Sequence, residues 1–222
     1  WKTAVIDAPF GGGKGGINCD RAALSRDELE RLTRRFVQQV HDFIGPDKDI
    51  PAPDVGTDAQ VMAWIMSEYS KFHGFQPACV TGKPVDLHGS PGREDATGFG
   101  VFLVTRELLA RMDRPLAGAT VAVQGDGDVG SYTARFFHRA GAKVVAVSDA
   151  FGAIYRAEGL DIPALDEHMQ EHRKVGGFGG GEAKTNEELL TLSVDVLIPA
   201  ALGGVIDAAL AEEVRAKLIV EA

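Results

Sequence analysis

The chain has 222 residues, 45% hydrophobic and 25% charged, and its 32 acidic and 23 basic side chains give a formal net charge of -9. This composition is typical of a globular protein with one or two domains, and the acidic excess argues against nucleic acid as a partner. The two cysteines, Cys19 and Cys79, lack the spacing of a metal site or a disulfide framework, so we expect no metal and a reducing, cytoplasmic location. No apolar run is long enough to cross a membrane and no signal peptide is recognisable, so no membrane partner is expected either.

The first part of the chain carries helix signals separated by glycine- and proline-rich segments. Ser25 and Glu28 form a capping box followed by apolar residues at helical period, and Thr57 with Gln60 predicts the start of a second helix. The loop-rich segment 80–92 is the predicted domain boundary. The expected elements, in chain order, are a strand at 2–6, a helix from 25 to about 44, a strand at 48–53 and a helix from 57 to about 72.

From residue 119 onward the pattern predicts apolar strands alternating with helices. Asp95 is expected to cap a helix before this region, and the glycine-rich segment 176–181 within it is expected to be a surface loop. Strands made of consecutive Val, Ile and Ala and separated by helices predict a parallel sheet covered on both faces. The expected strands are 120–123, 143–147, 194–198 and 218–220, and the expected helices are 129–140, 163–173 and 207–216.

We therefore expect an α/β fold made of two domains. Residues 1–92 are predicted to form a partial α/β substrate-binding and assembly domain, and residues 93–222 a Rossmann-like dinucleotide-binding domain. The chain opens on Trp1 rather than Met and closes on a strand-like run, so we interpret it as an internal fragment in which the first domain is truncated at its N-terminus and the second at its C-terminus.

A glycine fingerprint follows the predicted strand 120–123 and opens a helix. Gly125, Gly127 and Gly130 have the spacing that allows a tight turn, close approach of the backbone to a pyrophosphate, and close packing of helix on strand. The alternative is a glycine-rich turn that only packs a helix against a strand. Because the fingerprint lies in the strand-turn-helix context that its mechanism needs, we favour dinucleotide binding.

Acidic residues near this fingerprint bear on the choice of coenzyme. Asp149 ends the next strand, 19 residues after Gly130, where a carboxylate accepts hydrogen bonds from ribose hydroxyls and repels a 2′-phosphate, which favours NAD over NADP. Asp126 and Asp128, however, place two carboxylates in the proposed pyrophosphate loop, at a cost of about 1 kcal/mol each if they point at the ligand.

A second glycine-dense segment surrounds Lys14 in the sequence PFGGGKGGI. It is not a P-loop, because Gly15 follows the lysine where a hydroxyl residue would hold magnesium. Glycines on both sides can leave the ammonium half-desolvated and close to Lys2, and both effects would lower the pKa of Lys14 toward a catalytically useful value. The alternative is a glycine hinge with an exposed lysine.

Three further polar residues stand in loop or cap positions. Asp54, in PAPDVGT, is either a functional carboxylate or part of the cap of the helix that follows. Arg93 and Thr97, in GREDATGFG, lie at the predicted domain junction, where ligand clefts commonly form, although Thr97 could also be an ordinary first-turn helix residue.

Taken together, these segments resemble the glutamate/leucine/phenylalanine/valine dehydrogenase family, most closely its glutamate branch, over essentially the whole chain. The resemblance rests on Lys2 twelve positions before Lys14 in PFGGGKGGI, on IPAPDVGT forty positions further on, on TGKPVDLHGSPGREDATGFGV, and on the dinucleotide loop with VVAVSD. It implies reversible oxidative deamination of L-glutamate to 2-oxoglutarate and ammonia with hydride transfer to NAD or, less expected here, NADP, by a homohexamer.

The resemblance also implies individual roles. Lys14 would be the catalytic lysine, Asp54 would transfer protons to and from the substrate amino group, and Lys2 would hold the substrate α-carboxylate. The implied coenzyme-binding residues are Arg93, Thr97, Gly125, Gly127, Asp128, Val129, Gly130, Asp149 and Ala201.

The chain departs from the family pattern at three places. Asp126 replaces an aromatic or aliphatic residue, Asp128 replaces an asparagine, and ALGG at 201–204 replaces Ala-Leu-Glu-Asn, which removes an amide that helps to place the coenzyme. Residues that recognise the side-chain carboxylate of glutamate lie outside this chain. Two alternatives therefore stay open: a non-catalytic or regulatory subunit, and a leucine- or valine-type dehydrogenase.

Overall fold

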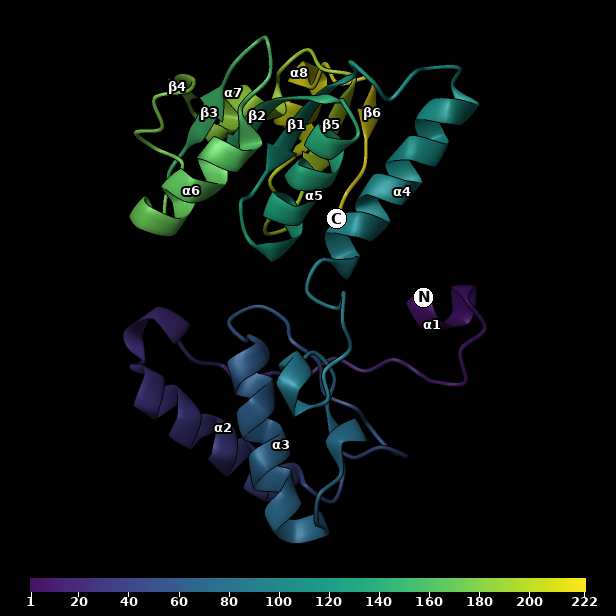
Figure 1. Ribbon diagram of the computed structural model, residues 1–222, viewed down its shortest axis with the longest axis vertical. Helices are drawn as coiled ribbons and strands as arrows, with labels where there is room; N and C mark the ends of the chain where they lie inside the picture. The colour runs from purple at the N-terminus through teal and green to yellow at the C-terminus, as the bar shows by residue number, and fades with distance from the viewer. The chain divides into compact units, whose positions relative to one another are not determined.

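The computed structural model describes residues 1–222, except for the side chain of Lys2. The chain divides into two compact units, Trp1–Arg93 and Glu94–Ala222 (Figure 1). Helices combined with a six-stranded sheet confirm the predicted mixed α/β fold class. Among the described residues, no helix has both the length and the apolar character needed to cross a membrane.

Two long helices form the body of the first unit. Helix α2 (Arg26–Val40) begins at the predicted capping box: Ser25 Oγ accepts a hydrogen bond from the Glu28 amide, and the Glu28 carboxylate accepts one from the Ser25 amide. Helix α3 (Ala59–His73) is buried along most of its length and packs on α2. The shared core contains Leu29, Val37, Ile44, Val61, Met62, Trp64, Ile65, Met66, Tyr69, Cys79 and Val80.

A buried carboxylate joins these two helices. The Glu68 side chain on α3 is only 2% exposed, and it accepts hydrogen bonds from Arg34 and Gln38 of α2 and from Lys71 of its own helix. Burial acts to raise the pKa of Glu68, but the hydrogen bonds from Lys71, Gln38 and Arg34 outweigh it and lower that pKa to about 2. The helix pair is therefore joined by a satisfied polar contact as well as by apolar packing.

Both strands predicted in the first unit are wrong. Residues 2–6 contain a short helix, α1 (Lys2–Val5), because a short apolar run does not itself distinguish strand from helix and the Val5 amide finds a local acceptor in the Trp1 carbonyl. Segment 48–53 contributes only an isolated bridge between Ile44 and Asp49, since two of its residues are prolines without an amide donor.

The cap of α3 also differs from the prediction. Asp58, not Thr57, is the N-cap residue, and its carboxylate accepts a hydrogen bond from the Val61 amide at 2.9 Å. The Thr57 hydroxyl instead accepts from the Asp54 amide and donates to the Asp54 carbonyl, both at 2.8 Å. The remaining elements of this unit are 3₁₀ turns at Arg21–Ala23, Pro77–Cys79 and Val85–Leu87.

The second unit is a layered α/β domain with strand order β4-β3-β2-β1-β5-β6. Its strands are β1 (Thr120–Gln124), β2 (Lys143–Ser148), β3 (Ala153–Tyr155), β4 (Glu182–Lys184), β5 (Val196–Pro199) and β6 (Leu218–Ile219). Its helices are α4 (Ala96–Arg111), α5 (Asp128–Arg139), α6 (Ile162–His172), α7 (Asn186–Leu190) and α8 (Ala208–Glu213).

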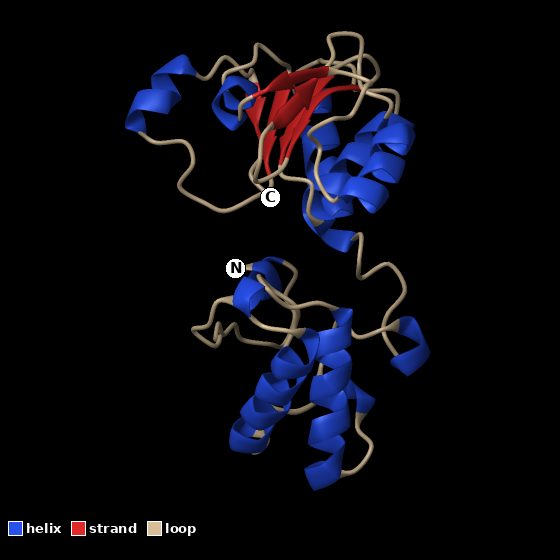
Figure 2. Ribbon diagram, turned by 90° about the vertical axis from the view of Figure 1, so that its left-hand side faces the viewer, coloured by secondary structure: helices blue, strands red, loops and turns tan.

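Helices cover both faces of this sheet, as predicted (Figure 2). Successive side chains of a strand point to opposite faces. Val121 and Val123 of β1 accordingly join the apolar cluster with α4, α5 and α6, whereas Ala122 joins the cluster with α7 and α8. The buried β1 and β2 strands carry apolar side chains on both faces, which is why they read as continuous apolar runs in the sequence.

The prediction of an all-parallel sheet is wrong at one edge. Strands β2, β1, β5 and β6 are parallel, but β3 and β4 pair antiparallel with β2 and with each other. These two strands have three residues each, too few to show a periodic pattern. The predicted cap of α4 is only half right: Asp95 holds the N-cap position, but its side chain makes no capping hydrogen bond within the described structure.

Candidate functional site

The glycine fingerprint lies where the order of the sheet reverses. Strand β1 has β2 on one side and β5 on the other, and the crevice at the carboxyl ends of such strands is the usual ligand position in open α/β sheets. Gly125 has a φ of +96°, and a Cβ there would lie 2.7 Å from the Ala200 carbonyl oxygen. A Cβ on Gly130 would collide with the Gly125 carbonyl. Both positions therefore require glycine for the turn and for close helix packing.

Gly127 differs from the other two glycines of the fingerprint. A Cβ added there would meet no atom within 4 Å, so nothing in the unit itself requires the absence of a side chain. Gly127 is the N-cap residue of α5. The free amides and the positive dipole end at the start of a helix favour an anion, and a bare backbone lets that anion approach closely.

Residues after β5 flank the same turn. The Ala200 amide donates to the Gln124 carbonyl at 2.8 Å, which continues the β1–β5 pairing beyond the strands. A Cβ on Gly125 would lie 3.2 Å from the Cβ of Ala201. The structure thus brings Ala201 to the fingerprint, although the two are far apart in the sequence.

Asp126 is a half-buried carboxyl inside the loop. Its pKa is raised from 3.8 to about 7, first because of burial and then because of the neighbouring carboxylates of Asp166 and Asp149, with Arg135 acting in the opposite direction. At neutral pH this group is therefore only partly ionised, which reduces the repulsion that the sequence predicts. Asp128 is exposed, as the first residue of α5, where a negative charge complements the helix dipole.

The Asp149 carboxylate is already hydrogen-bonded to backbone amides. One oxygen accepts from Phe151 at 2.7 Å and from Gly152 at 3.1 Å, and the other accepts from Val175 at 2.7 Å. These bonds fold the turn between β2 and β3 and tie it to the segment after α6. Part of the acceptor capacity of Asp149 is therefore committed to holding the chain.

In the first unit, the structure brings Lys14 and Asp54 into direct contact across forty positions of sequence. Lys14 Nζ donates to Asp54 Oδ2, and Asp54 Oδ1 accepts from the Val55 amide at 2.7 Å. Because Thr57 bonds both the amide and the carbonyl of Asp54, the loop around the carboxylate is closed on itself. The cap alternative for Asp54 is therefore wrong, and the α3 cap is Asp58.

The surroundings of Lys14 are open. Its side chain is 82% exposed, so the predicted half-burial of the ammonium is not found in this unit. A Cβ added at Gly11, Gly12, Gly13, Gly15 or Gly16 would meet no atom within 4 Å, and none of them has a positive φ. Neither internal packing nor a positive φ therefore requires glycine at these five positions.

The other predicted site residues occupy less distinctive positions. Arg93 is partly buried at the end of the first unit, Thr97 lies in the first turn of α4, and Val129 lies in the first turn of α5. Neither Arg93 nor Thr97 makes a side-chain hydrogen bond to another described residue. The predicted role of the Lys2 side chain lies outside the described part of the structure.

Two polar side chains near the fingerprint were missed by sequence reasoning. Gln124 Oε1 and Asn186 Oδ1 are buried without a hydrogen-bond partner among the described residues. The amide nitrogen of Asn186 donates to the Asp149 carbonyl at 3.0 Å, so its oxygen lies near the end of β2. A polar residue ending an apolar strand was the available signal for Gln124; Asn186 gave none, because its partner is 37 residues away.

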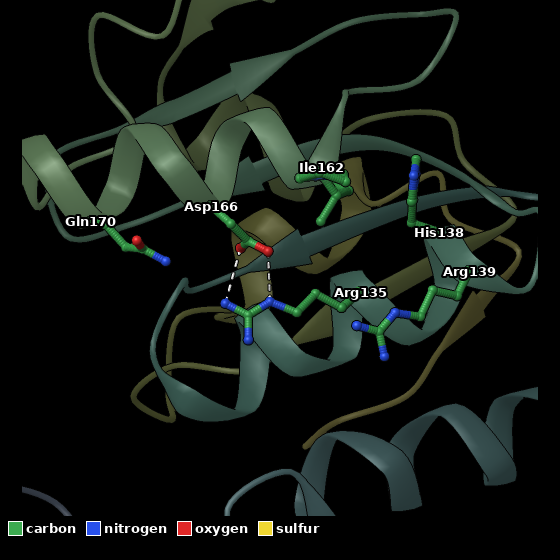
Figure 3. A pocket seen from close by; sticks show the side chains of 7 residues that line it. Arg135, His138, Arg139, Ile162, Asp166 and Gln170 are labelled. Carbon is green, nitrogen blue, oxygen red and sulfur yellow. Dashed lines mark hydrogen bonds and ion pairs between the residues drawn. The ribbon is translucent and has the colours of Figure 1, made fainter.

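A separate pocket of about 360 Å³ lies between α5 and α6 (Figure 3). Arg135 on α5 makes two parallel hydrogen bonds to Asp166 on α6, at 2.7 and 3.1 Å. The same ion pair lies close enough to Asp126 to influence its pKa. The pocket shares no residue with the fingerprint, and this electrostatic effect is what links the two.

The second unit has a fold of the Rossmann type, with the glycine fingerprint in the turn between β1 and α5. Comparisons with known proteins give the family. Residues 89–222 match the model of the Glutamate/Leucine/Phenylalanine/Valine dehydrogenase family, and residues 1–71 match that of the Glu/Leu/Phe/Val dehydrogenase dimerisation domain. The chain therefore belongs to the glutamate/leucine/phenylalanine/valine dehydrogenase family, as its sequence motifs predicted.

Individual relatives carry the name glutamate dehydrogenase. The chain is 50% identical over its full length to NAD-specific glutamate dehydrogenase A of Halobacterium salinarum, covering 51% of that protein. It resembles the hetero-hexameric glutamate dehydrogenase of Thermus thermophilus in its leucine-bound form, with a TM-score of 0.94 and 44% identity over the whole chain and 52% of that structure. For the glutamate dehydrogenase of Peptoniphilus asaccharolyticus, the TM-score is 0.75 and the sequence identity is 38%, again over the whole chain and 52% of that structure. The chain thus spans about half the length of these relatives.

Proposed function

We propose that this chain forms part of an NAD-dependent glutamate dehydrogenase, which interconverts L-glutamate, water and oxidised NAD with 2-oxoglutarate, ammonium, NADH and a proton. The observation that carries the proposal is the direct contact between Lys14 and Asp54 in a segment whose glycines leave the ammonium open to a ligand. The family membership and the names of the relatives support glutamate as the substrate. A leucine- or valine-type activity is the alternative within the family.

The paired side chains suit the proton transfers of this reaction. Lys14 Nζ can stabilise negative charge on a substrate oxygen and orient a water molecule, while Asp54 Oδ2 can take a proton from the substrate amino group and return it. Two groups in contact can also exchange a proton with each other, so that each is reset after a turnover. The role proposed for Lys2 is to hold the substrate α-carboxylate by its positive charge.

The glycines of the second unit are suited to binding the pyrophosphate of a dinucleotide. Gly127 leaves the start of α5 open, and Gly125 and Gly130 keep the turn tight. When bound, NAD supplies the chemistry of hydride acceptance, and the protein supplies position and charge. The negative charge of Asp149 favours NAD over NADP, even though its oxygens also hold the β2–β3 turn. Arg93, Thr97, Val129 and Ala201 are proposed as further coenzyme contacts.

The test replaces Lys14 by alanine in the intact enzyme that contains this chain. NADH formation from glutamate is followed by absorbance, and leucine, valine and phenylalanine are assayed separately as alternative substrates. We expect the Lys14→Ala variant to lose at least about 10²-fold in kcat, in line with the loss of a positioned acid–base group, and to keep its NADH affinity and melting temperature. Lys174→Ala, at an exposed lysine of the second unit, is the control. Full activity in the Lys14 variant contradicts the proposal.

A second candidate is a non-catalytic subunit of a mixed assembly. The observation that favours it is Asp126, a carboxyl in the coenzyme loop that ionises near neutral pH and, when ionised, repels a pyrophosphate. The hetero-hexameric relative shows that mixed assemblies exist in this family. Fluorescence titration with NADH separates the two: tight binding supports the catalytic subunit, and absence of binding at millimolar NADH supports the non-catalytic one.

We also propose that the protein assembles into a hexamer in the cytoplasm. The matched dimerisation domain supports assembly, and several large apolar side chains of the first unit are exposed, including Phe43 at 72% and Phe75 at 66%. The free thiols of Cys19 and Cys79 fit a reducing compartment. Light scattering on the purified protein, alone and mixed with related subunits, distinguishes a homohexamer from a mixed one.

A further inference from the structure

Two histidines and an aspartate meet where helices α2 and α3 end. His41 is the C-cap residue of α2, Asp42 follows it, and His73 is the last residue of α3. His41 Nδ1 lies 3.1 Å from His73 Nε2 and 3.3 Å from Asp42 Oδ1, and His73 Nε2 lies 3.9 Å from the same oxygen. Each residue therefore offers one ligand atom to a single small volume.

The spacing of these atoms fits a tetrahedral metal ion. In a zinc site with bonds of about 2.0–2.1 Å, neighbouring ligand atoms lie about 3.3–3.4 Å apart. Two of the three separations, 3.1 and 3.3 Å, lie close to that value, whereas His73 Nε2 and Asp42 Oδ1, at 3.9 Å, would have to approach each other by about half an ångström for tetrahedral coordination. The site would thus need only small side-chain adjustments to accept the ion.

Aromatic packing already orients both imidazoles. The His41 ring stacks on Phe72 with centroids 4.0 Å apart and planes 5° apart, and the His73 ring stacks on Tyr69 at 4.5 Å and 26°. Both histidine side chains are about three-quarters buried, whereas Asp42 is 74% exposed. Oriented ligands lose little rotamer freedom on binding, and the exposed aspartate leaves an entry path for the ion.

The electrostatics of this position also favour a cation. Asp42 supplies a carboxylate, and the C-termini of α2 and α3 both place the negative ends of their dipoles here. Lys48 donates to the main-chain carbonyl of Asp42 at 2.5 Å and so leaves its carboxylate available. Two imidazoles with one carboxylate suit zinc and similar transition metals, whereas calcium and magnesium prefer oxygen ligands alone.

We propose that His41, Asp42 and His73 form a binding site for a zinc-class divalent cation that joins the end of α2 to the end of α3. Three protein ligands leave the fourth tetrahedral position to water. The site shares no residue with the proposed catalytic pair, and the proposal does not depend on the proposed function. Sequence spacing gave no sign of it, because the two histidines are 32 positions apart and are adjacent only in the folded unit.

The test measures zinc binding directly. Purified protein carrying Cys19→Ser, which removes the exposed thiol as a competing ligand, is titrated with zinc sulfate in competition with a chromophoric chelator. We expect one equivalent of zinc per chain from this site. His73→Asn should abolish that equivalent, and Asp42→Asn should weaken it by at least about tenfold. His88→Asn is the matched control, because His88 is an exposed histidine of the same unit.

A second readout reports the coordination geometry of the bound ion. Substitution by Co²⁺ should give the intense visible absorption of tetrahedral coordination in the parent protein and in His88→Asn, and only the weak spectrum of hydrated cobalt in His73→Asn. Asp42 is exposed and lies outside the core, so Asp42→Asn tests the site without risk to the fold. Equal zinc binding by the parent and the His73 and Asp42 variants, or no binding by the parent, would overturn the proposal.

Discussion

Asp126 offers the sharpest test of the electrostatics of the coenzyme loop. Its pKa is raised from 3.8 to about 7 by burial and by the charges of Asp166 and Asp149. Between these two pH values the folded chain holds a proton that the unfolded chain has released. Stability is therefore lost as the pH rises from about 4 to about 7, and the full cost of the ionised carboxylate is present above pH 7.

The magnitude follows from the shift. A rise of about three pH units corresponds to about 4 kcal/mol, which is an upper limit because Asp126 is partly exposed and solvent screens its charge. Asp126→Asn removes the charge and nearly preserves the shape. We expect this variant to be about 1–3 kcal/mol more stable than the parent at pH 8 and nearly equal to it at pH 4.

The assay is urea unfolding of both proteins at several values between pH 4 and pH 8, followed by circular dichroism. Asp128→Asn is the matched control, because it removes the same charge from an exposed position of the same loop. That control should lose up to about 1 kcal/mol, since a negative charge at the start of α5 is favourable. If Asp126→Asn is no more stable than the parent at pH 8, or gains equally at pH 4, the reasoning is wrong.

Further substitutions test the glycine turn and the two polar contacts. Gly130→Ala should destabilise the second unit by about 2 kcal/mol or more, measured by calorimetry, because its Cβ meets the backbone. Gly127→Ala should keep the melting temperature of the parent but bind NADH more weakly, measured by fluorescence. Asp195 accepts hydrogen bonds from Lys217 Nζ at 2.8 Å and from the Thr120 amide at 3.0 Å, and the bond from Lys217 is the largest cause that lowers the Asp195 pKa to about 2. Asp195→Asn should therefore cost about 1–2 kcal/mol at pH 7 and converge with the parent as the pH falls through about 2; an unchanged urea midpoint refutes this. Glu68→Gln should destabilise the first unit by about 2–4 kcal/mol, because it breaks the buried ion pairs with Arg34 and Lys71. An unchanged melting temperature would contradict this prediction.

Local sequence signals predicted the elements that depend on neighbouring residues. Three such signals act over only a few positions and can therefore be recognised from the sequence alone: the Ser25 capping box, the apolar runs of β1 and β2, and the glycines of the fingerprint. The strands predicted at 2–6 and 48–53 were wrong for a related reason. A strand requires a partner, and no run of residues contains the information that a partner strand lies beside it.

Long-range contacts decided the details of the candidate site. Sequence placed Asp149 at the end of a strand, but only the folded unit shows that amides from Phe151, Gly152 and Val175 already bind its carboxylate. Sequence likewise marked Lys14 as a candidate and left open whether it is half-buried or exposed, and only the folded unit shows its exposure and its contact with Asp54. Solvation and partner choice depend on which segments meet, and that is a property of packing.

The sequence by itself determined the family, the α/β class and the positions of the glycines that make a dinucleotide turn possible, because these depend on residue type and short spacing. Tertiary structure decided the protonation of Asp126 and the gathering of His41, Asp42 and His73. A pKa depends on burial and on charges supplied from distant parts of the chain, and a metal site depends on where ligand atoms meet in space. Both are set only when the helices and strands pack.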